Sequence, residues 1–196
     1  MSKNIRILLI LYICAIPICV GSDKSKNLLI GKTTVIMSEP DGFCLHKMGY
    51  PLMKDQIGQW DFITLAGMSI FAIYGSCVDS AVNSSTAIVS MSTDHINKRF
   101  NNPLSKWVSF MAKVFREKVP NRESVENDEL AAYYSRIVPV INDSILEKTI
   151  FIESAVTIVK GKPLSFYLIY EGSTPKLDEK RYVKLKKWIH NIHNLN

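Results

Sequence analysis

The sequence predicts an α+β fold: a single domain in which helices pack on an antiparallel sheet, preceded by a signal peptide. Two β-rich runs, Thr149 to Val159 and Leu164 to Tyr170, flank the turn sequence Lys160-Gly161-Lys162-Pro163, a pattern typical of a hairpin. Apolar residues recur at helical spacing from Leu104 to Lys118, and again from about Leu177 to Leu195. Strands and helices mixed in this order indicate the α+β class.

Residues 1–22 have the features of a secretory signal peptide. Lys3 and Arg6 precede an apolar run from Ile7 to Val20, and the small residues Gly21 and Ser22 follow it. A helix needs roughly 20 apolar residues to cross a bilayer, and this run is shorter. We therefore expect cleavage after Gly21 or Ser22. A protein tethered by an uncleaved first helix is the alternative.

The composition indicates one globular domain over residues 23–196. Hydrophobic residues make up 47% of the chain and charged residues 21%, values typical of a folded protein. The net charge of +6 is modest, and no dense basic stripe is interleaved with aromatic residues, so we do not expect nucleic acid as a partner.

Basic residues do gather near the end of the chain. We interpret them first as the solvated face of the last helix, and second as a surface for weak contact with an anionic membrane or an acidic partner. The residues are Lys176, Lys180, Arg181, Lys184, Lys186 and Lys187.

Cys44 and Cys77 are the two cysteines left after signal cleavage, because Cys14 and Cys19 lie within the leader. In an oxidising compartment a disulfide between them is the first expectation, and two free buried thiols are the alternative. A metal site would need more ligands nearby than His46, and a redox pair would show Cys-x-x-Cys spacing. We therefore predict a structural disulfide.

The first half of the mature chain contains four predicted strands. They are Leu28 to Met37, Phe43 to His46 after the turn Glu39-Pro40-Asp41-Gly42, Leu65 to Cys77, and Thr86 to Ser92. Apolar residues on both faces of the third indicate a strand in the middle of the sheet. We expect a short helix opening near Pro51 within Met48 to Phe62, and a loop from Asp79 to Ser85.

A loop or helical turn from Asp94 to Pro103 leads into the helix from Leu104 to Lys118. Asn102 is the predicted cap, Pro103 the first helical residue, and Pro120 the stop. The helix carries an apolar stripe that we assign to the core, with no cofactor. The stripe consists of Leu104, Trp107, Val108, Met111, Val114 and Phe115.

The second half begins with a predicted helix from Ser124 to Ser135, followed by a turn or loop from Asp143 to Lys148. The hairpin follows, with Pro163 just outside the strand pairing, and then a loop from Glu171 to Pro175. The last helix is expected to bury one face, made of Tyr182, Leu185, Trp188, Ile189 and Ile192.

Several of these segments together resemble a group of uncharacterised exported bacterial proteins. The Asp41-Gly42-Phe43-Cys44 turn, Cys77, the Val159-Lys160-Gly161-Lys162 hairpin and the segment from Trp188 to Asn196 carry the resemblance. In that group a Pro-x-Gly-aromatic-Cys segment follows the first strand. The resemblance implies export and the cysteine pair but no reaction. The order of elements is also similar to that of small exported domains of the PsbP/Mog1 type.

No motif for a serine hydrolase, phosphate-binding loop, zinc protease or calcium loop is present, so we assign no catalytic, cofactor or metal residues. His190 and His193 could share a metal, but an exposed helix end is the preferred interpretation. Asp94 and His95 could serve acid–base chemistry, yet no nucleophile accompanies them. A thiolate–imidazole pair of Cys44 and His46 would be excluded by a disulfide.

The remaining polar candidates are acids and glycosylation sites. Glu126, Asp128 and Glu129 are interpreted as a solvated helix start rather than a glycosidase pair. Asn83 and Asn142 lie in acceptor sequences that matter only on a eukaryotic secretory route. We predict an exported, periplasmic or secreted, non-enzymatic domain that binds a ligand or protein partner; the alternative is a hydrolase-type enzyme with an unrecognised site.

Overall fold

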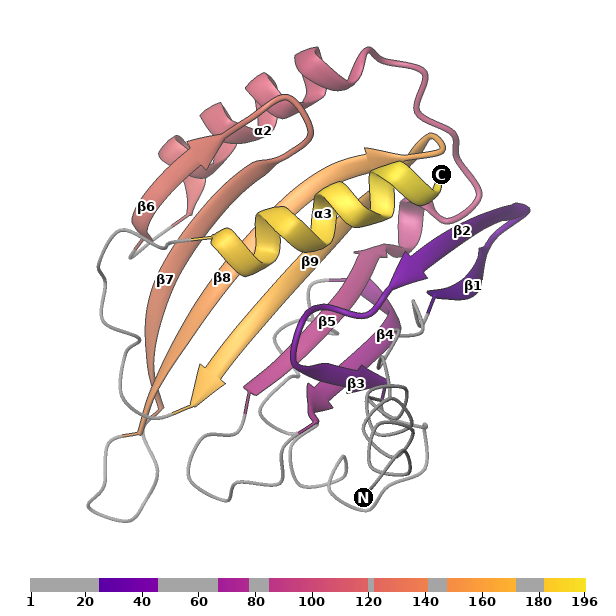
Figure 1. Cartoon of the computed structure of the whole chain (residues 1–196). Coiled ribbons are helices and arrows are strands. Elements are labelled where there is room, and N and C mark those ends of the chain that lie inside the picture. Colours follow the sequence, from indigo (N-terminus) through magenta and orange to yellow (C-terminus); the bar gives the residue numbers. More distant parts are fainter. Residues whose placement is uncertain (1–24, 46–66, 78–84, 120–121, 141–147, 172–181) are drawn as a thin grey trace, which may run out of the picture.

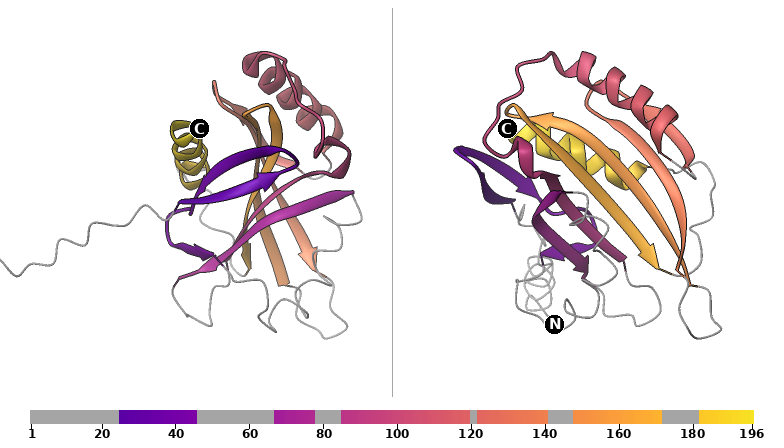
Figure 2. Two further views of the ribbon diagram at one scale, coloured as in Figure 1. Left: turned by 90° about the vertical axis from the view of Figure 1, so that its right-hand side faces the viewer. Right: turned by 180° about the vertical axis from the view of Figure 1, so that it is seen from behind.

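The structure is a computed structural model that describes residues 25–45, 67–77, 85–119, 122–140, 148–171 and 182–196. A seven-stranded antiparallel sheet with the order β3-β4-β5-β9-β8-β7-β6 is its main element, and one helix lies on each face (Figures 1 and 2). This arrangement confirms the α+β prediction. The strands of the sheet are β3 (Phe43–Leu45), β4 (Met68–Ser76), β5 (Ser85–Ser92), β6 (Arg122–Asn127), β7 (Ala132–Val140), β8 (Lys148–Val159) and β9 (Lys162–Glu171).

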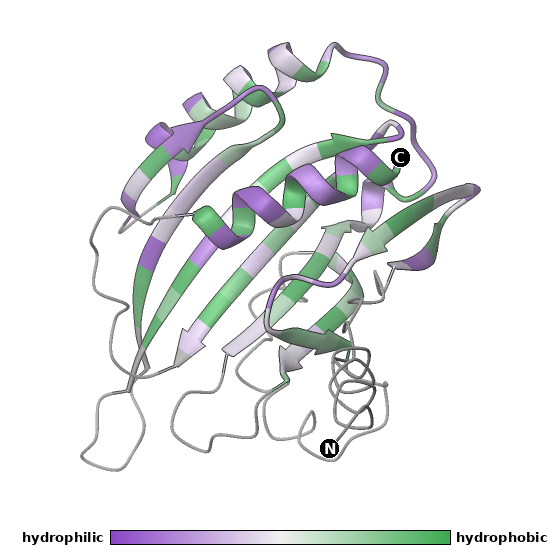
Figure 3. Cartoon of the chain, viewed as in Figure 1, coloured by the Kyte–Doolittle hydropathy of each residue, from purple (hydrophilic) through white to green (hydrophobic). Residues whose placement is uncertain are grey.

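Alternation along β8 explains why both faces of the sheet are covered. Ala155 and Val159 belong to the main core beneath helix α3 (Val183–Leu195), whereas Val156 packs beneath helix α2 (Leu104–Lys118). Successive strand residues point to opposite faces, so an apolar run supplies two cores. Hydrophobic residues accordingly dominate the central strands (Figure 3).

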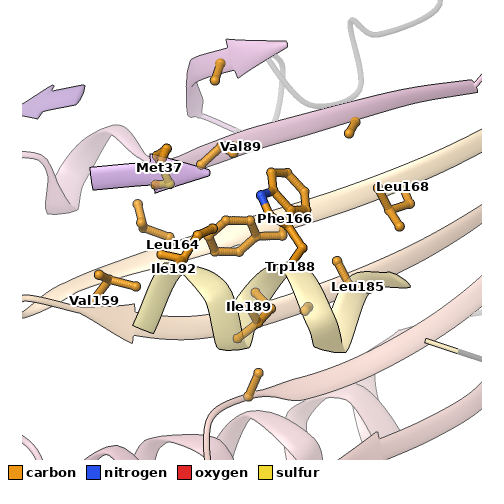
Figure 4. Packing of buried hydrophobic residues seen from close by; sticks show 14 of the residues in the cluster. Met37, Val89, Val159, Leu164, Phe166, Leu168, Leu185, Trp188, Ile189 and Ile192 are labelled. Atoms are coloured by element: carbon orange, nitrogen blue, oxygen red, sulfur yellow. The ribbon is translucent and has the colours of Figure 1, made fainter. Parts of the chain in front are cut away.

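Trp188 is the centre of the larger core. Its ring meets Phe166 edge to face at 5.0 Å and Tyr74 at 5.6 Å, and apolar side chains from the sheet and α3 converge around it (Figure 4). Every residue of the predicted buried face of the last helix is buried, from Tyr182 to Ile192. The helix itself begins at Val183, however, later than the predicted Leu177.

The predicted strand Leu28 to Met37 is two strands. The structure has β1 (Ser25–Ile30) and β2 (Thr33–Ser38), paired antiparallel as a separate two-stranded sheet. The chain reverses at Gly31, whose φ of 60° is the left-handed conformation that glycine adopts without steric cost. The apolar residues before the turn and the β-branched run Thr33-Thr34-Val35-Ile36 after it fit a single strand, so the turn was missed.

The predicted helix from Ser124 to Ser135 is wrong, because this segment forms the hairpin β6–β7. Its turn is built by Asp128, whose Oδ1 accepts the N–H groups of Leu130 at 2.8 Å and Ala131 at 2.9 Å. An Asp side chain that bonds the backbone a few residues on favours a turn over a helix. The apolar residues at helical spacing were therefore misleading.

The hairpin β8–β9 is confirmed, with Lys160 and Gly161 as its two turn residues at φ values of 50° and 77°. Positive φ at both positions is the geometry of the turn that best matches strand twist. Pro163 lies within the pairing, opposite Ile158, rather than just outside it.

The bounds of α2 match the predicted helix, but its cap does not. Pro103, not Asn102, is the N-cap residue, and no side chain bonds the first turn. Val119, which precedes Pro120, is extended at ψ 113°, as proline requires of its neighbour. The predicted loop from Asp94 to Pro103 contains the short 3-10 helix η1 (Thr93–His95).

Strands β3, β4 and β5 agree with prediction where they are described. Phe43 N–H donates to Pro40 O at 3.0 Å, which closes the predicted turn. Strand β4 pairs with β3 and β5 on its two sides, as expected for an interior strand. The leader at 1–22, the helix expected near Pro51, the sequons at Asn83 and Asn142, and most of the loops at 79–85, 143–148 and 171–175 lie outside the described residues.

Candidate functional site

Cys44 and Cys77 form the predicted disulfide, which joins β3 to the end of β4. Their Cα atoms are 5.2 Å apart, and Cys77 N–H donates to Gly42 O at 3.1 Å. A sulfur in a disulfide cannot act as a thiolate, so the pairing excludes the Cys44–His46 couple. His46 itself lies outside the described residues.

His193 fastens the last helix to the sheet. Its Nε2 lies 2.9 Å from Thr157 Oγ1, and the same hydroxyl donates to Leu130 O at 2.5 Å. Since the only hydroxyl hydrogen goes to Leu130, the imidazole Nε2–H must be the donor to Thr157. Burial and the neighbouring His190 lower the pKa of His193, whereas Asp128 opposes that shift. Thr157 is fully buried, so this hydroxyl is a structural link.

The other histidines have separate surroundings. His190 Nδ1 lies 3.0 Å from Lys186 O, and its Nε2 lies 4.0 Å from a carboxylate oxygen of Glu129. The ring of His95 packs against Phe100 at 4.8 Å, beside the exposed Asp94. Within the described ranges no group of three or more His, Cys, Asp or Glu side chains could hold a metal ion.

The acids that were predicted to form a helix start serve the hairpin β6–β7 and its contact with α3. Glu126 pairs with Lys186 at 2.9 Å, and Asp128 Oδ2 accepts the hydroxyl of Tyr133 at 2.8 Å. Glu129 is exposed. The carboxylates are thus spread over separate contacts and do not converge on one point.

The lysines of the last helix are partly neutralised by acids of the same chain. Lys186 pairs with Glu126 and also lies 5.4 Å from the centre of the Tyr133 ring, while Lys187 Nζ lies 2.6 Å from Asp41 Oδ2. Lys184 is exposed, and Lys176, Lys180 and Arg181 lie outside the described residues. This helix presents less free positive charge than its sequence indicates.

The outer side of α2 carries the most distinctive surface of the described chain. Phe110 keeps 57% of its accessible area, and Lys106 and Lys113 stand four residues before it and three after it. Residues at these spacings lie on one helix face. We call the exposed residues Lys106, Phe110 and Lys113, with Arg116 and Lys118 on their two flanks, the basic aromatic face; the acid Glu117 lies on the same side of the helix.

A row of packed rings connects Phe110 to the preceding segment. Phe110 lies 6.2 Å from Trp107, Trp107 lies 5.4 Å from Phe100, and Phe100 contacts His95, all measured between ring centres. Trp107, Phe100 and His95 are each half-buried, so their outer edges continue the apolar surface. Figure 1 places α2 at the outer margin of the molecule.

The sequence analysis missed this surface because it assigned α2 only to the core. One cue was present: Phe110 falls outside the apolar stripe and between two lysines on the polar side. An aromatic residue on the polar side of an amphipathic helix is not required by core packing. The cue therefore indicates a surface role.

Comparisons with known proteins leave the family open: no protein-family model matches the chain, and no curated protein matches it. No helix in the described part of the chain is long and apolar enough to cross a bilayer.

Proposed function

We propose that this chain is an exported, non-enzymatic domain that binds its partner through the basic aromatic face of α2. The observation that carries the proposal is the 57% exposure of Phe110 between Lys106 and Lys113. Single exposed apolar residues are common on proteins. Phe110, however, continues a row of rings in edge-on and tilted contact, and the cations beside it supply a second means of recognition.

Export is supported by the leader sequence and by the disulfide. Disulfides form and persist in oxidising compartments, and the Cys44–Cys77 bond is the kind of cross-link that such proteins carry. The resemblance to exported bacterial proteins points in the same direction. We place the mature domain in the periplasm or outside the cell.

Binding is favoured over catalysis because three reactive groups of the described residues make contacts within the fold. The Thr157 hydroxyl, the His193 imidazole and the Asp128 carboxylate each hold one element of the fold to another. A nucleophile must reach its substrate, and Thr157 is fully buried. The exposed chemistry of α2 is that of an interaction surface.

An environment-sensitive dye on Ser109→Cys tests the proposal, because Ser109 is exposed beside Phe110. The matched control carries the dye on Asn194→Cys, an exposed position on α3. Adding the cell-envelope fraction of the exporting host should shift the emission of the dye at position 109 and leave position 194 unchanged. Equal shifts, or none at position 109, would contradict the proposal.

The same preparation tests export. The mature protein should have the mass of a chain that has lost about its first 21 residues, and it should resist alkylation until reduced. An intact leader on the exported protein would favour the tethered alternative. Uptake of two alkylating groups without reductant would remove the disulfide argument.

A further inference from the structure

We infer that the partner of the basic aromatic face is an anionic lipid surface, an inference that rests on the proposed function and specifies its partner. Within α2 the cations are Lys106, Lys113, Arg116 and Lys118, and Glu117 is the one acid. Its carboxylate lies 3.9 Å from Lys113 Nζ, with both side chains mostly exposed. An exposed pair at this distance is weak, so the helix presents a positive field to solvent.

The type of cation favours lipid over protein. Three of the four are lysines, whose long flexible side chains adapt to mobile headgroups and carry a strongly hydrated charge. Lysine is depleted in the cores of protein–protein interfaces, where arginine is preferred. Lysines near an anionic bilayer, by contrast, each add to binding.

The shape of the surface points the same way. Helix α2 lies on one side of the sheet, at the margin of the molecule, which the side view shows (Figure 2). A helix at the margin with one exposed aromatic ring can meet a flat, deformable surface without a complementary groove. Phe110 would enter the boundary between headgroups and acyl chains, where aromatic rings are favourable.

The buried side of α2 limits how deeply it can insert. Val108, Ala112 and Phe115 are core residues beneath the helix, so the apolar stripe is not available to lipid. Binding therefore depends on the cations of α2, on Phe110 and on the exposed ring edges beside it. This predicts a peripheral, reversible association that weakens steeply with ionic strength.

The last helix provides a matched comparison on the same chain. Lys184 and Lys187 are exposed lysines, and Val183 keeps 53% of its accessible area, close to the value for Phe110. Lys187, however, is paired with Asp41. Equal lysine substitutions on the two helices change the net charge alike but alter different faces of the molecule.

Co-sedimentation with vesicles tests the inference. The purified mature protein should bind vesicles of phosphatidylglycerol and phosphatidylcholine but not vesicles of pure phosphatidylcholine. Salt at about 0.5 M should release it, because the charges are then screened over a few ångströms. Lys106→Gln/Lys113→Gln should weaken binding about tenfold or more, and Phe110→Ser several-fold. Lys184→Gln/Lys187→Gln and Val183→Ser should bind as the parent protein does.

Three outcomes would overturn the inference, and they separate it from the proposed function. If the dye at position 109 responds to the envelope fraction but the protein ignores pure anionic vesicles, the partner is not lipid and the binding proposal stands. If soluble poly-L-glutamate binds this face and vesicles do not, the partner is an acidic protein. If the substitutions on α3 weaken vesicle binding as much as those on α2, the binding is due to the net charge of the protein or to the last helix, and not to the basic aromatic face.

Discussion

The side-chain amide of Asn196 pairs with the backbone of Ile36. Its Nδ2 donates to Ile36 O at 2.7 Å, and its Oδ1 accepts Ile36 N–H at 2.9 Å. The amide thereby occupies the edge of β2 as a neighbouring strand would. Trp188 Nε1 donates to Ser38 O at 2.7 Å and Lys160 Nζ to Thr34 O at 3.2 Å, so every second residue of this edge is held.

Asn196→Ala should therefore loosen the N-terminal hairpin. The substitution removes these two exposed bonds and a third, from Nδ2 to Ile192 O at 2.7 Å. Net contributions of roughly 0.5–1.5 kcal/mol are usual for a hydrogen bond and exposed ones lie at the low end, so we expect a loss of about 1–2 kcal/mol in the free energy of unfolding. Urea unfolding measures it, and amide exchange should show faster exchange at Ile36. Asn194→Ala, an exposed neighbour on the same helix, should change the stability by less than about 0.5 kcal/mol.

Removing the disulfide should destabilise the domain more strongly. The bond closes a loop with a sequence separation of 33, for which the chain-entropy relation gives about 3–4 kcal/mol. Cys44→Ala/Cys77→Ala should lower the urea midpoint accordingly, and a reducing agent should lower the midpoint of the parent protein similarly. The reducing agent should not change the urea midpoint of the double variant. A change there would mean that another group is being reduced.

Local patterns predicted the parts of the fold that depend on neighbouring residues. The helix from Leu104 to Lys118 and the hairpin around Gly161 follow from spacing and turn chemistry within a few residues. The hairpin β6–β7 could not be found that way, because Val125, Leu130 and Tyr134 also fit a helix. Pairing of β7 with β8, along which Tyr134 lies opposite Ser154, decides the outcome.

The free charge of the last helix depends on partners distant in sequence. Lys187 and Asp41 are 146 residues apart, so the loss of free charge on the last helix could not be seen in its sequence. The disulfide was predictable, since two cysteines in an exported chain leave one pairing. The exposure of Phe110 was also indicated by its place outside the apolar stripe, between two lysines, although the stripe alone already accounted for a buried helix.

Acidification should weaken the attachment of the last helix. The folded pKa of His193 lies below 6.5, so the unfolded chain binds a proton more readily than the native protein does. Stability is therefore complete above about pH 6.5 and decreases as the pH falls below that value toward the folded pKa. Urea unfolding between about pH 7.5 and 5 measures this slope.

Two variants test whether His193 causes this pH dependence of the free energy of unfolding. Glutamine in His193→Gln can still donate an amide N–H to Thr157, but it does not titrate. The free energy of unfolding of this variant should therefore change less with pH in this range. Asn194→Gln, at an exposed position on the same helix where no titrating group is changed, should keep the parent slope. An unchanged slope in the His193 variant would assign the effect to other groups.

Gly31 and Gly42 should respond differently to the same added methyl group. Both have positive φ, 60° and 82°, so alanine at either site incurs the left-handed penalty of roughly 1–2 kcal/mol. A Cβ at Gly31 would also lie 2.5 Å from the backbone oxygen of Ile96, whereas a Cβ at Gly42 meets nothing within 4 Å. A backbone oxygen moves only with its segment, which Lys162 Nζ holds through bonds to Ile96 O at 2.7 Å and Lys98 O at 2.8 Å. Gly31→Ala should thus cost about 1–3 kcal/mol more than Gly42→Ala in urea unfolding, and equal costs would show that the segment around Ile96 yields freely.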